Sequence, residues 1–75
     1  MKVLLFGILS EITEATEIEI ADVLTVDDLK NRMYEKYPML QNQQFFVAIN
    51  HEKSINNEKI KPGDKIALLP AFAGG

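Results

Sequence analysis

The chain has no cysteine, no tryptophan and only one histidine among its 75 residues. Without cysteine it cannot form the disulfide framework that stabilises many small secreted domains. One histidine and no cysteine also leave no cluster that could hold a structural metal. A domain of this length buries only somewhat more than about 60% of its unfolded surface. The hydrophobic residues, 47% of the chain, must therefore supply the core alone or with help from a partner surface.

Positive charge is scarce. The chain has 8 Lys and Arg against 11 Asp and Glu, a net charge of -3. Lys59, Lys61 and Lys65 lie close in sequence, but Glu58 and Asp64 are interleaved with them. This pattern indicates a solvated rim of mixed charge, so we expect no nucleic-acid partner.

Long hydrophobic runs are also absent. No apolar stretch approaches the length needed to span a bilayer, so we expect no membrane partner. The short apolar run at residues 2–9 continues into an acidic segment without the cleavage pattern of a signal peptide. We expect a cytoplasmic protein.

The first half of the chain contains two strand patterns. Residues 2–9, KVLLFGIL, are almost entirely apolar, which predicts a strand buried on both faces in the middle of a sheet. Residues 17–23, EIEIADV, begin with alternating acidic and apolar side chains and predict a half-exposed strand. The polar segment between them is expected to close a loose hairpin.

Residues 25–38 predict the main helix. Thr25 is a good N-cap, and Asp27 and Asp28 suit the positive end of the helix dipole. Pro38 marks the end of the helix because it lacks a backbone N–H. The apolar stripe expected to pack on the core has helical spacing: Val26, Leu29, Met33 and Tyr37.

The second half predicts two more strands. They are residues 45–50, followed by a polar turn, and residues 65–69, preceded by a Pro62-Gly63-Asp64 turn. A short pairing segment around Ser54 and Ile55 is expected between them. If the apolar last strand lies parallel to the first, the chain forms one α+β domain over residues 1–75. This is the β-grasp, or ubiquitin-like, fold: a mixed sheet of four to five strands with one main helix on one face.

Conventional active-site motifs are missing. The chain has no phosphate-binding glycine loop and no dinucleotide fingerprint. His51 is the only histidine, and in a polar turn it is expected to be solvated rather than part of a catalytic triad. Asp27 and Asp28 are adjacent on a helix and do not face each other. An enzyme acting alone is therefore not expected.

The remaining candidate is the tail at residues 70–75, PAFAGG, which we expect to be flexible. Pro70 cannot donate to a sheet ladder and is expected to end the last strand. Six extended residues reach roughly 20 Å. Gly74 and Gly75 have no Cβ and can pass through a narrow channel. Once adenylated, the Gly75 carboxylate would carry a good leaving group. A frayed end or a cloning remnant is the alternative.

Taken together, the segments VLLFGIL, VAIN and IKPGDKIALLP and the terminal GG resemble the MoaD-type small subunit of molybdopterin synthase, in the ThiS/MoaD sulfur-carrier family. The resemblance covers essentially the whole chain. It implies that an ATP-dependent, MoeB-type, E1-like activating enzyme adenylates Gly75, and that a sulfurtransferase system converts it to a thiocarboxylate. It also implies that the tail enters a MoaE-type large subunit and donates sulfur to cyclic pyranopterin monophosphate in molybdenum cofactor biosynthesis. The catalytic residues would belong to the large subunit, in a heterotetramer, and this chain would bind no cofactor.

The apolar residues near the tail are the candidate partner contacts. Phe6 and Leu69 lie in proposed central strands, so a core role and a contact role are both open. Phe72 lies beyond the last strand, which favours an exposed contact. The other predicted contacts lie in the tail: Pro70, Ala71 and Ala73. The family tail has a second proline and an aliphatic residue where this chain has Ala71 and Phe72, a departure that bears on which partner receives the tail and leaves the Gly-Gly chemistry unchanged.

Three other functions fit the same pattern. A ThiS-type sulfur carrier for thiamine thiazole synthesis has the same fold and tail chemistry but a different acceptor. A ubiquitin-like modifier would join Gly75 to a lysine of a target protein. A plain β-grasp interaction module would have an inert tail.

Overall fold

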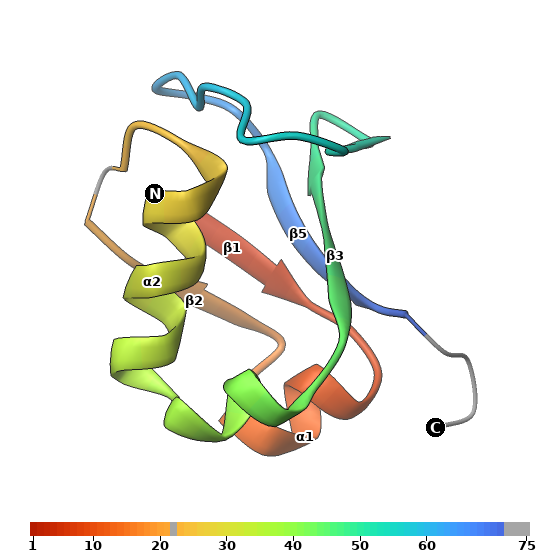
Figure 1. Ribbon diagram of the computed structural model, residues 1–75. Helices are drawn as coiled ribbons and strands as arrows, with labels where there is room; N and C mark the ends of the chain where they lie inside the picture. The colour runs from red at the N-terminus through yellow and green to blue at the C-terminus, as the bar shows by residue number, and fades with distance from the viewer. Residues whose placement is uncertain (22, 72–75) are drawn as a thin grey trace.

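The computed structural model describes residues 1–21 and 23–71 of the chain. The elements follow in the order β1 (Lys2–Leu5), α1 (Ile8–Thr13), β2 (Glu17–Glu19), α2 (Val26–Lys36), the 3-10 helix η1 (Pro38–Asn42), β3 (Phe45–Ile49), β4 (Glu52–Lys53) and β5 (Ile66–Pro70). The strands form one five-stranded sheet in the order β2-β1-β5-β3-β4, and α2 packs on one of its faces (Figure 1). The predicted β-grasp arrangement is confirmed.

The centre of the sheet is the parallel pair β1 and β5. Val3 lies beside Ile66 and Leu5 beside Leu68, while β5 runs antiparallel to β3 over five residue pairs. This mixed pairing joins the first and last strands of the chain, as the sequence predicts.

Alternation along these strands builds the core on the helix side. Val3, Leu5 and Leu68 are buried beneath α2. From α2 itself, Leu29 and Met33 are completely buried, which confirms the predicted apolar stripe. The N-cap is also confirmed, because the Thr25 side chain accepts a hydrogen bond of 3.2 Å from the Asp28 N–H.

The first apolar run does not form one strand. β1 ends at Leu5, and Gly7 adopts φ 57° and ψ -136°, after which the chain enters α1. Leu9 is completely buried from this helix, and Thr13 Oγ1 donates a hydrogen bond of 3.0 Å to its carbonyl. The prediction of a strand reaching Leu9 is therefore wrong, because α1 begins at Ile8, whereas the expected hairpin is confirmed by the antiparallel pairing of β1 with β2. The glycine conformation turns the chain away from the sheet.

The short fourth strand lies earlier than expected. Asn50 and His51 have φ values of 52° and 72°, which indicates a two-residue hairpin turn. β4 pairs with β3 directly after this turn, rather than at Ser54 and Ile55. Ser54 still donates a backbone hydrogen bond of 2.7 Å to Val47, but Ile55 is 78% exposed.

Candidate functional site

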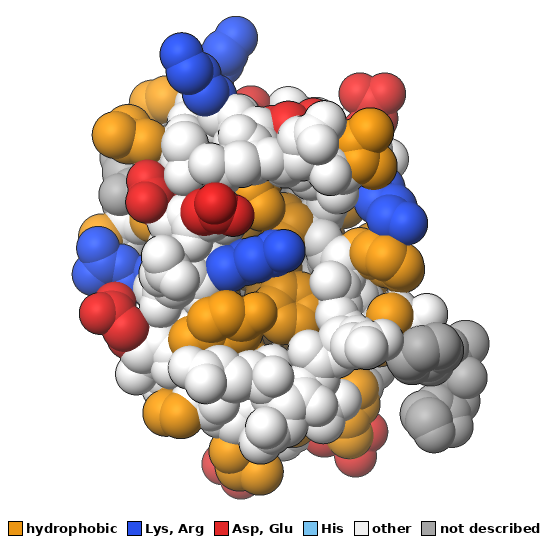
Figure 2. Space-filling model, viewed as in Figure 1, with side chains coloured by type: hydrophobic (Ala, Val, Ile, Leu, Met, Phe, Trp, Pro, Cys, Tyr) orange, Lys and Arg blue, Asp and Glu red, His pale blue; other side chains and the backbone are white. Residues whose placement is uncertain are grey.

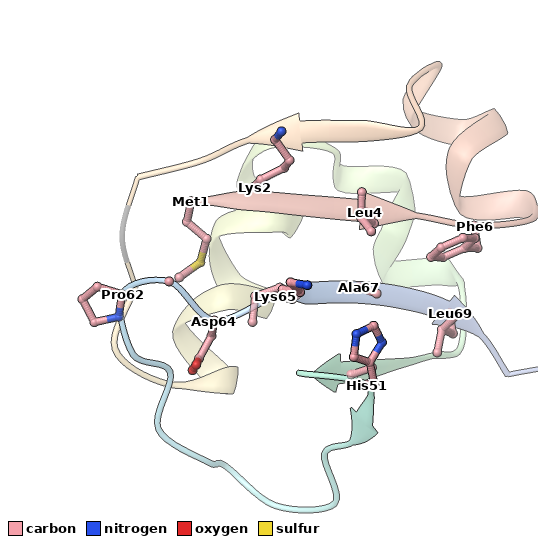
Figure 3. Close-up of a pocket in the computed structure, with 13 residues that line it drawn as sticks. Met1, Lys2, Leu4, Phe6, His51, Pro62, Asp64, Lys65, Ala67 and Leu69 are labelled. Atoms are coloured by element: carbon pink, nitrogen blue, oxygen red, sulfur yellow. The ribbon is translucent and has the colours of Figure 1, made fainter.

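The face of the sheet opposite α2 carries an exposed apolar surface. Leu4 lies beside Ala67 in the parallel pair, and the neighbouring positions Phe6 and Leu69 face the same side (Figure 3). We call these four residues, Leu4, Phe6, Ala67 and Leu69, the open-face patch. They line a groove of about 900 Å³. Because no element of the described chain covers this side of the sheet, the patch is available for contact with another molecule.

The structure distinguishes between a core role and a contact role for Phe6. Its side chain is 46% exposed, so it is not a core residue, and Leu69 on the last strand is half-buried beside it. The sequence placed both in central strands and left a core role and a contact role open. Their position on the open face is compatible with partner contact, and that role stays a prediction.

The groove is bordered by polar and charged side chains. His51 is exposed and points over the groove from the β3–β4 turn (Figure 3). On the neighbouring strand, Phe46 lies beside Leu69, and Lys53 Nζ is 3.6 Å from the centre of the Phe46 ring. At the opposite border, Lys2 Nζ lies 3.6 Å from Glu17 Oε2. An apolar centre within a polar rim is the usual composition of a protein-binding surface.

A hydrogen-bonded turn holds the start of β5 in place. Asp64 accepts hydrogen bonds from the Lys61 N–H at 2.8 Å and from Asn50 Nδ2 at 3.0 Å. Asn50 Oδ1 in turn accepts from the Lys65 N–H at 2.9 Å. The backbone hydrogen bond from Lys61, followed by the Asn50 hydrogen bond, lowers the pKa of Asp64 below its ordinary value. This cluster fixes the β3–β4 turn to the loop that leads into β5.

The first two residues of the tail, Pro70 and Ala71, are attached to the sheet more firmly than expected. β5 runs through Pro70, which lies beside Phe45 of β3, and the Ala71 N–H donates a hydrogen bond of 3.0 Å to the Gln44 carbonyl. Four residues follow Ala71 in the sequence. They would reach about 14 Å when extended, rather than the roughly 20 Å expected for six residues.

The remaining predicted site residues cannot be placed. Phe72, Ala73, Gly74 and Gly75 lie outside the described residues. The structure brings Phe6, Leu69, Pro70 and Ala71 together where the central strands β1 and β5 end.

A second hollow lies on the helix side, where hydrophobic side chains are visible between α2 and β3 (Figure 2). It has a volume of about 300 Å³ and is lined in part by Phe45, Lys30 and Asn57. Asn57 Oδ1 accepts a hydrogen bond of 2.8 Å from the Asp27 N–H, so this polar group holds the start of α2. We do not assign a function to this hollow.

Within residues 1–21 and 23–71, no group of three or more His, Cys, Asp or Glu side chains is arranged to hold a metal ion. In the same part of the chain, no helix has the length and apolar character needed to cross a membrane.

Sequence reasoning missed several residues of this region: Leu4, Gly7, Gln44 and Ala67. Leu4 was hidden because the all-apolar run suggested burial on both faces, whereas β1 alternates between exposed and buried side chains. Gly7 was a visible signal, since a glycine inside an apparent strand often marks a bend or a close backbone approach.

Comparison with known proteins finds a matching family and several related proteins. The sequence model of the ThiS family matches residues 3–75. The molybdopterin synthase sulfur carrier subunit of Mycobacterium tuberculosis is 30% identical over all of this chain and 96% of that protein. A protein described as molybdopterin converting factor, subunit 1, from Pyrococcus furiosus has a TM-score of 0.80 and 19% identity, over 95% of each chain.

A further solved structure shares the fold. Small archaeal modifier protein 1 from Methanosarcina acetivorans has a TM-score of 0.79 and 23% identity, over 99% of this chain and 94% of that one. The structural matches support the β-grasp fold, and the sequence match over residues 3–75 shows the family. This chain belongs to the ThiS family.

Proposed function

We propose that this protein is a sulfur carrier that delivers sulfur as a thiocarboxylate at Gly75. Membership of the ThiS family supports the proposal, as does the name of its curated relative, a sulfur carrier subunit. The structural observation that carries it is the position of the open-face patch. This patch lies on the central strands β1 and β5, toward the end at which β5 leads into the residues that end in Gly-Gly.

The proposed chemistry begins with activation of the carboxylate. A Gly75 carboxylate oxygen attacks the α-phosphorus of ATP on an E1-like activating enzyme and releases pyrophosphate. A sulfur nucleophile at the oxidation level of sulfide then attacks the acyl carbon, and AMP leaves. The product is a thiocarboxylate. With glycine at the last two positions, no side chain hinders this attack.

The open-face patch supplies the docking surface in this proposal. Phe6 and Leu4 are 46% and 39% exposed and line the same groove as the half-buried Ala67 and Leu69, so the four residues form a contiguous apolar patch rather than scattered exposed side chains. Docking of a partner on this face would place its active site within reach of the tail. The four residues after Ala71 limit that reach to about 14 Å.

The proposed acceptor is cyclic pyranopterin monophosphate, held by a MoaE-type large subunit in a heterotetramer. The name of the Mycobacterium tuberculosis relative, a subunit of molybdopterin synthase, supports this acceptor. The catalytic residues of the transfer step would then lie in the large subunit.

A protein modifier is the second candidate function. The structural similarity to small archaeal modifier protein 1 favours it over an inert module. In this case a lysine amine of a target protein would attack the acyl carbon of the Gly75 adenylate, AMP would leave with loss of a proton from the amine, and an isopeptide bond would form.

Reconstitution distinguishes these acceptors. The chain is incubated with its activating enzyme, ATP and sulfide, then divided between a MoaE-type subunit with cyclic pyranopterin monophosphate, a thiazole synthase system and a cell extract. We expect molybdopterin in the first reaction only. Formation of thiazole instead would refute the proposed acceptor but keep the carrier function. Lysine conjugates without sulfur transfer would support the modifier.

A further inference from the structure

Gly7 lies at the junction between the end of β1 and the beginning of the tail. Its backbone angles, φ 57° and ψ -136°, are unfavourable for residues with an L side chain. It follows Phe6 of the open-face patch and begins the turn into α1, where its carbonyl accepts a hydrogen bond of 2.7 Å from Ser10 Oγ.

Gly7 is also in close contact with the last residue of β5. A Cβ atom added at Gly7 would lie 2.9 Å from Cγ of Pro70, with Cδ and Cβ of the same ring at 3.6 and 3.9 Å. A real Cβ does not approach another carbon this closely. The proline ring cannot turn away as a long flexible side chain can, because it is closed on its own backbone.

Pro70 cannot easily retreat from this contact. On its other side it lies beside Phe45 in the β3–β5 pair. The next residue, Ala71, is fixed by its hydrogen bond to the Gln44 carbonyl, and the Phe6 N–H donates to the Leu68 carbonyl at 3.3 Å. A side chain at position 7 would therefore displace the end of β5 or open the Ala71 hydrogen bond.

We propose that Gly7 is a positioning residue for the reactive tail. Its missing side chain lets the end of β5 at Pro70 lie in one fixed place, and this place sets the starting point of the residues that carry Gly75 into a partner. The proposal rests on the carrier function. A displacement of Pro70 moves the starting point of the four residues that follow Ala71, and a misplacement of about 1 Å in an active site can slow a reaction about 100-fold.

A double-mutant cycle separates this role from simple backbone strain. Gly7→Ala introduces both the strain and the contact with Pro70. Pro70→Ala removes Cγ, so the combined variant keeps the strain and loses the contact. In the activating-enzyme assay, measured as ATP-dependent pyrophosphate exchange, we expect Gly7→Ala to lower kcat about tenfold or more while KM changes less than about twofold. In the Pro70→Ala background the same change should have little further effect.

Two control variants test whether backbone strain alone, without the contact with Pro70, lowers kcat. Gly63→Ala introduces an L side chain at a comparable positive φ of 89°, with nothing within 4 Å, at the opposite end of β5. It should lower stability without the loss of kcat. Gly7→D-Ala, made by chemical synthesis, accepts the positive φ and points its methyl group away from the L position. It should fold even if Gly7→Ala does not, and it should retain kcat.

Hydrogen exchange of the isolated protein provides a readout that does not depend on the activating enzyme. We expect faster exchange of the Ala71 amide in Gly7→Ala, with protection retained in Gly7→D-Ala. Unchanged exchange in Gly7→Ala, or equal kcat for Gly7→Ala and Gly63→Ala, would overturn the proposal. So would loss of kcat in Gly7→D-Ala. If the wild-type chain is not activated at all, the proposed function fails. The exchange result still decides whether Gly7 fixes the positions of Pro70 and Ala71.

Discussion

Phe6 and Leu69 lie next to each other on the open face, one just beyond the end of β1 and the other near the end of β5. The pairing of Leu5 with Leu68 sets this register, and both side chains line the same groove. An apolar contact surface is thereby placed directly beside the start of the tail. In the proposed function, the contact surface binds the partner and the tail carries the reactive group.

The open-face patch should contribute to binding much more than to folding. Replacing the half-exposed Phe6 by Ala should cost about 1 kcal/mol of stability. It should raise the KM of the activating enzyme about 30-fold, which corresponds to a hot-spot loss of about 2 kcal/mol. Thermal unfolding and steady-state activation kinetics measure the two effects. Ile55→Ala is the matched control, because Ile55 is 78% exposed and does not line the groove. Equal KM values for the two variants would show that the patch is not the docking surface.

The terminal glycine should matter for chemistry alone. Deletion of Gly75 should leave the melting temperature within about 1 °C of the wild-type value, because terminal residues outside a sheet contribute little packing. Sulfur transfer should be lost, since the chain would then end in a differently placed carboxylate. Calorimetry and the reconstituted transfer assay provide the test. Large destabilisation by the deletion would mean that the end of the chain has a structural role.

The turn before β5 should give a defined pH dependence. The hydrogen bonds from Lys61 and Asn50 lower the folded-state pKa of Asp64 below the ordinary value of 3.8. The stability that this carboxylate contributes is therefore present above pH 3.8 and is lost as the pH falls through the lower folded-state pKa. Asp64→Asn should melt at a lower temperature than the wild type at neutral pH, and the difference should shrink below pH 3.8. A difference that persists unchanged into acid would show that the charge of Asp64 is not involved.

The N-cap of α2 should contribute to stability without affecting function. Thr25 accepts a hydrogen bond of 3.2 Å from the Asp28 N–H. Thr25→Ala should therefore reduce the free energy of unfolding by about 1 kcal/mol, whereas Thr25→Ser should keep most of it. Denaturant unfolding measures both values. If the Ser variant is as unstable as the Ala variant, the side-chain hydrogen bond is not the source of the effect.

The sequence predicted the topology because its strongest signals are local. The Thr25 cap, the stripe from Val26 to Met33 and the turn before β5 each have a distinct pattern, and the parallel placement of β1 and β5 follows from their shared apolar character. The helix α1 was missed because its apolar residues continue those of β1 without a break. The backbone conformation of Gly7 separates them, and the glycine is the one sign of this bend in the sequence.

The contact surface was only partly predictable for a related reason. An all-apolar strand such as KVLL does not show which face is covered, because that depends on where α2 packs. Gly7 and Pro70 are 63 positions apart in the sequence, and their close approach becomes visible only in the folded chain. Local patterns predict elements, whereas the position of the tail depends on how the first and last strands meet.

The intact mass of the protein, after incubation with its activating enzyme, ATP and sulfide, decides whether Gly75 becomes a thiocarboxylate. We expect a species heavier than the starting chain by the exchange of one oxygen for one sulfur, absent when ATP is omitted and absent in the Gly75 deletion. A mass that remains that of the unmodified carboxylate in the complete reaction, with an activating enzyme shown to be competent on another carrier, would contradict the proposed carrier function.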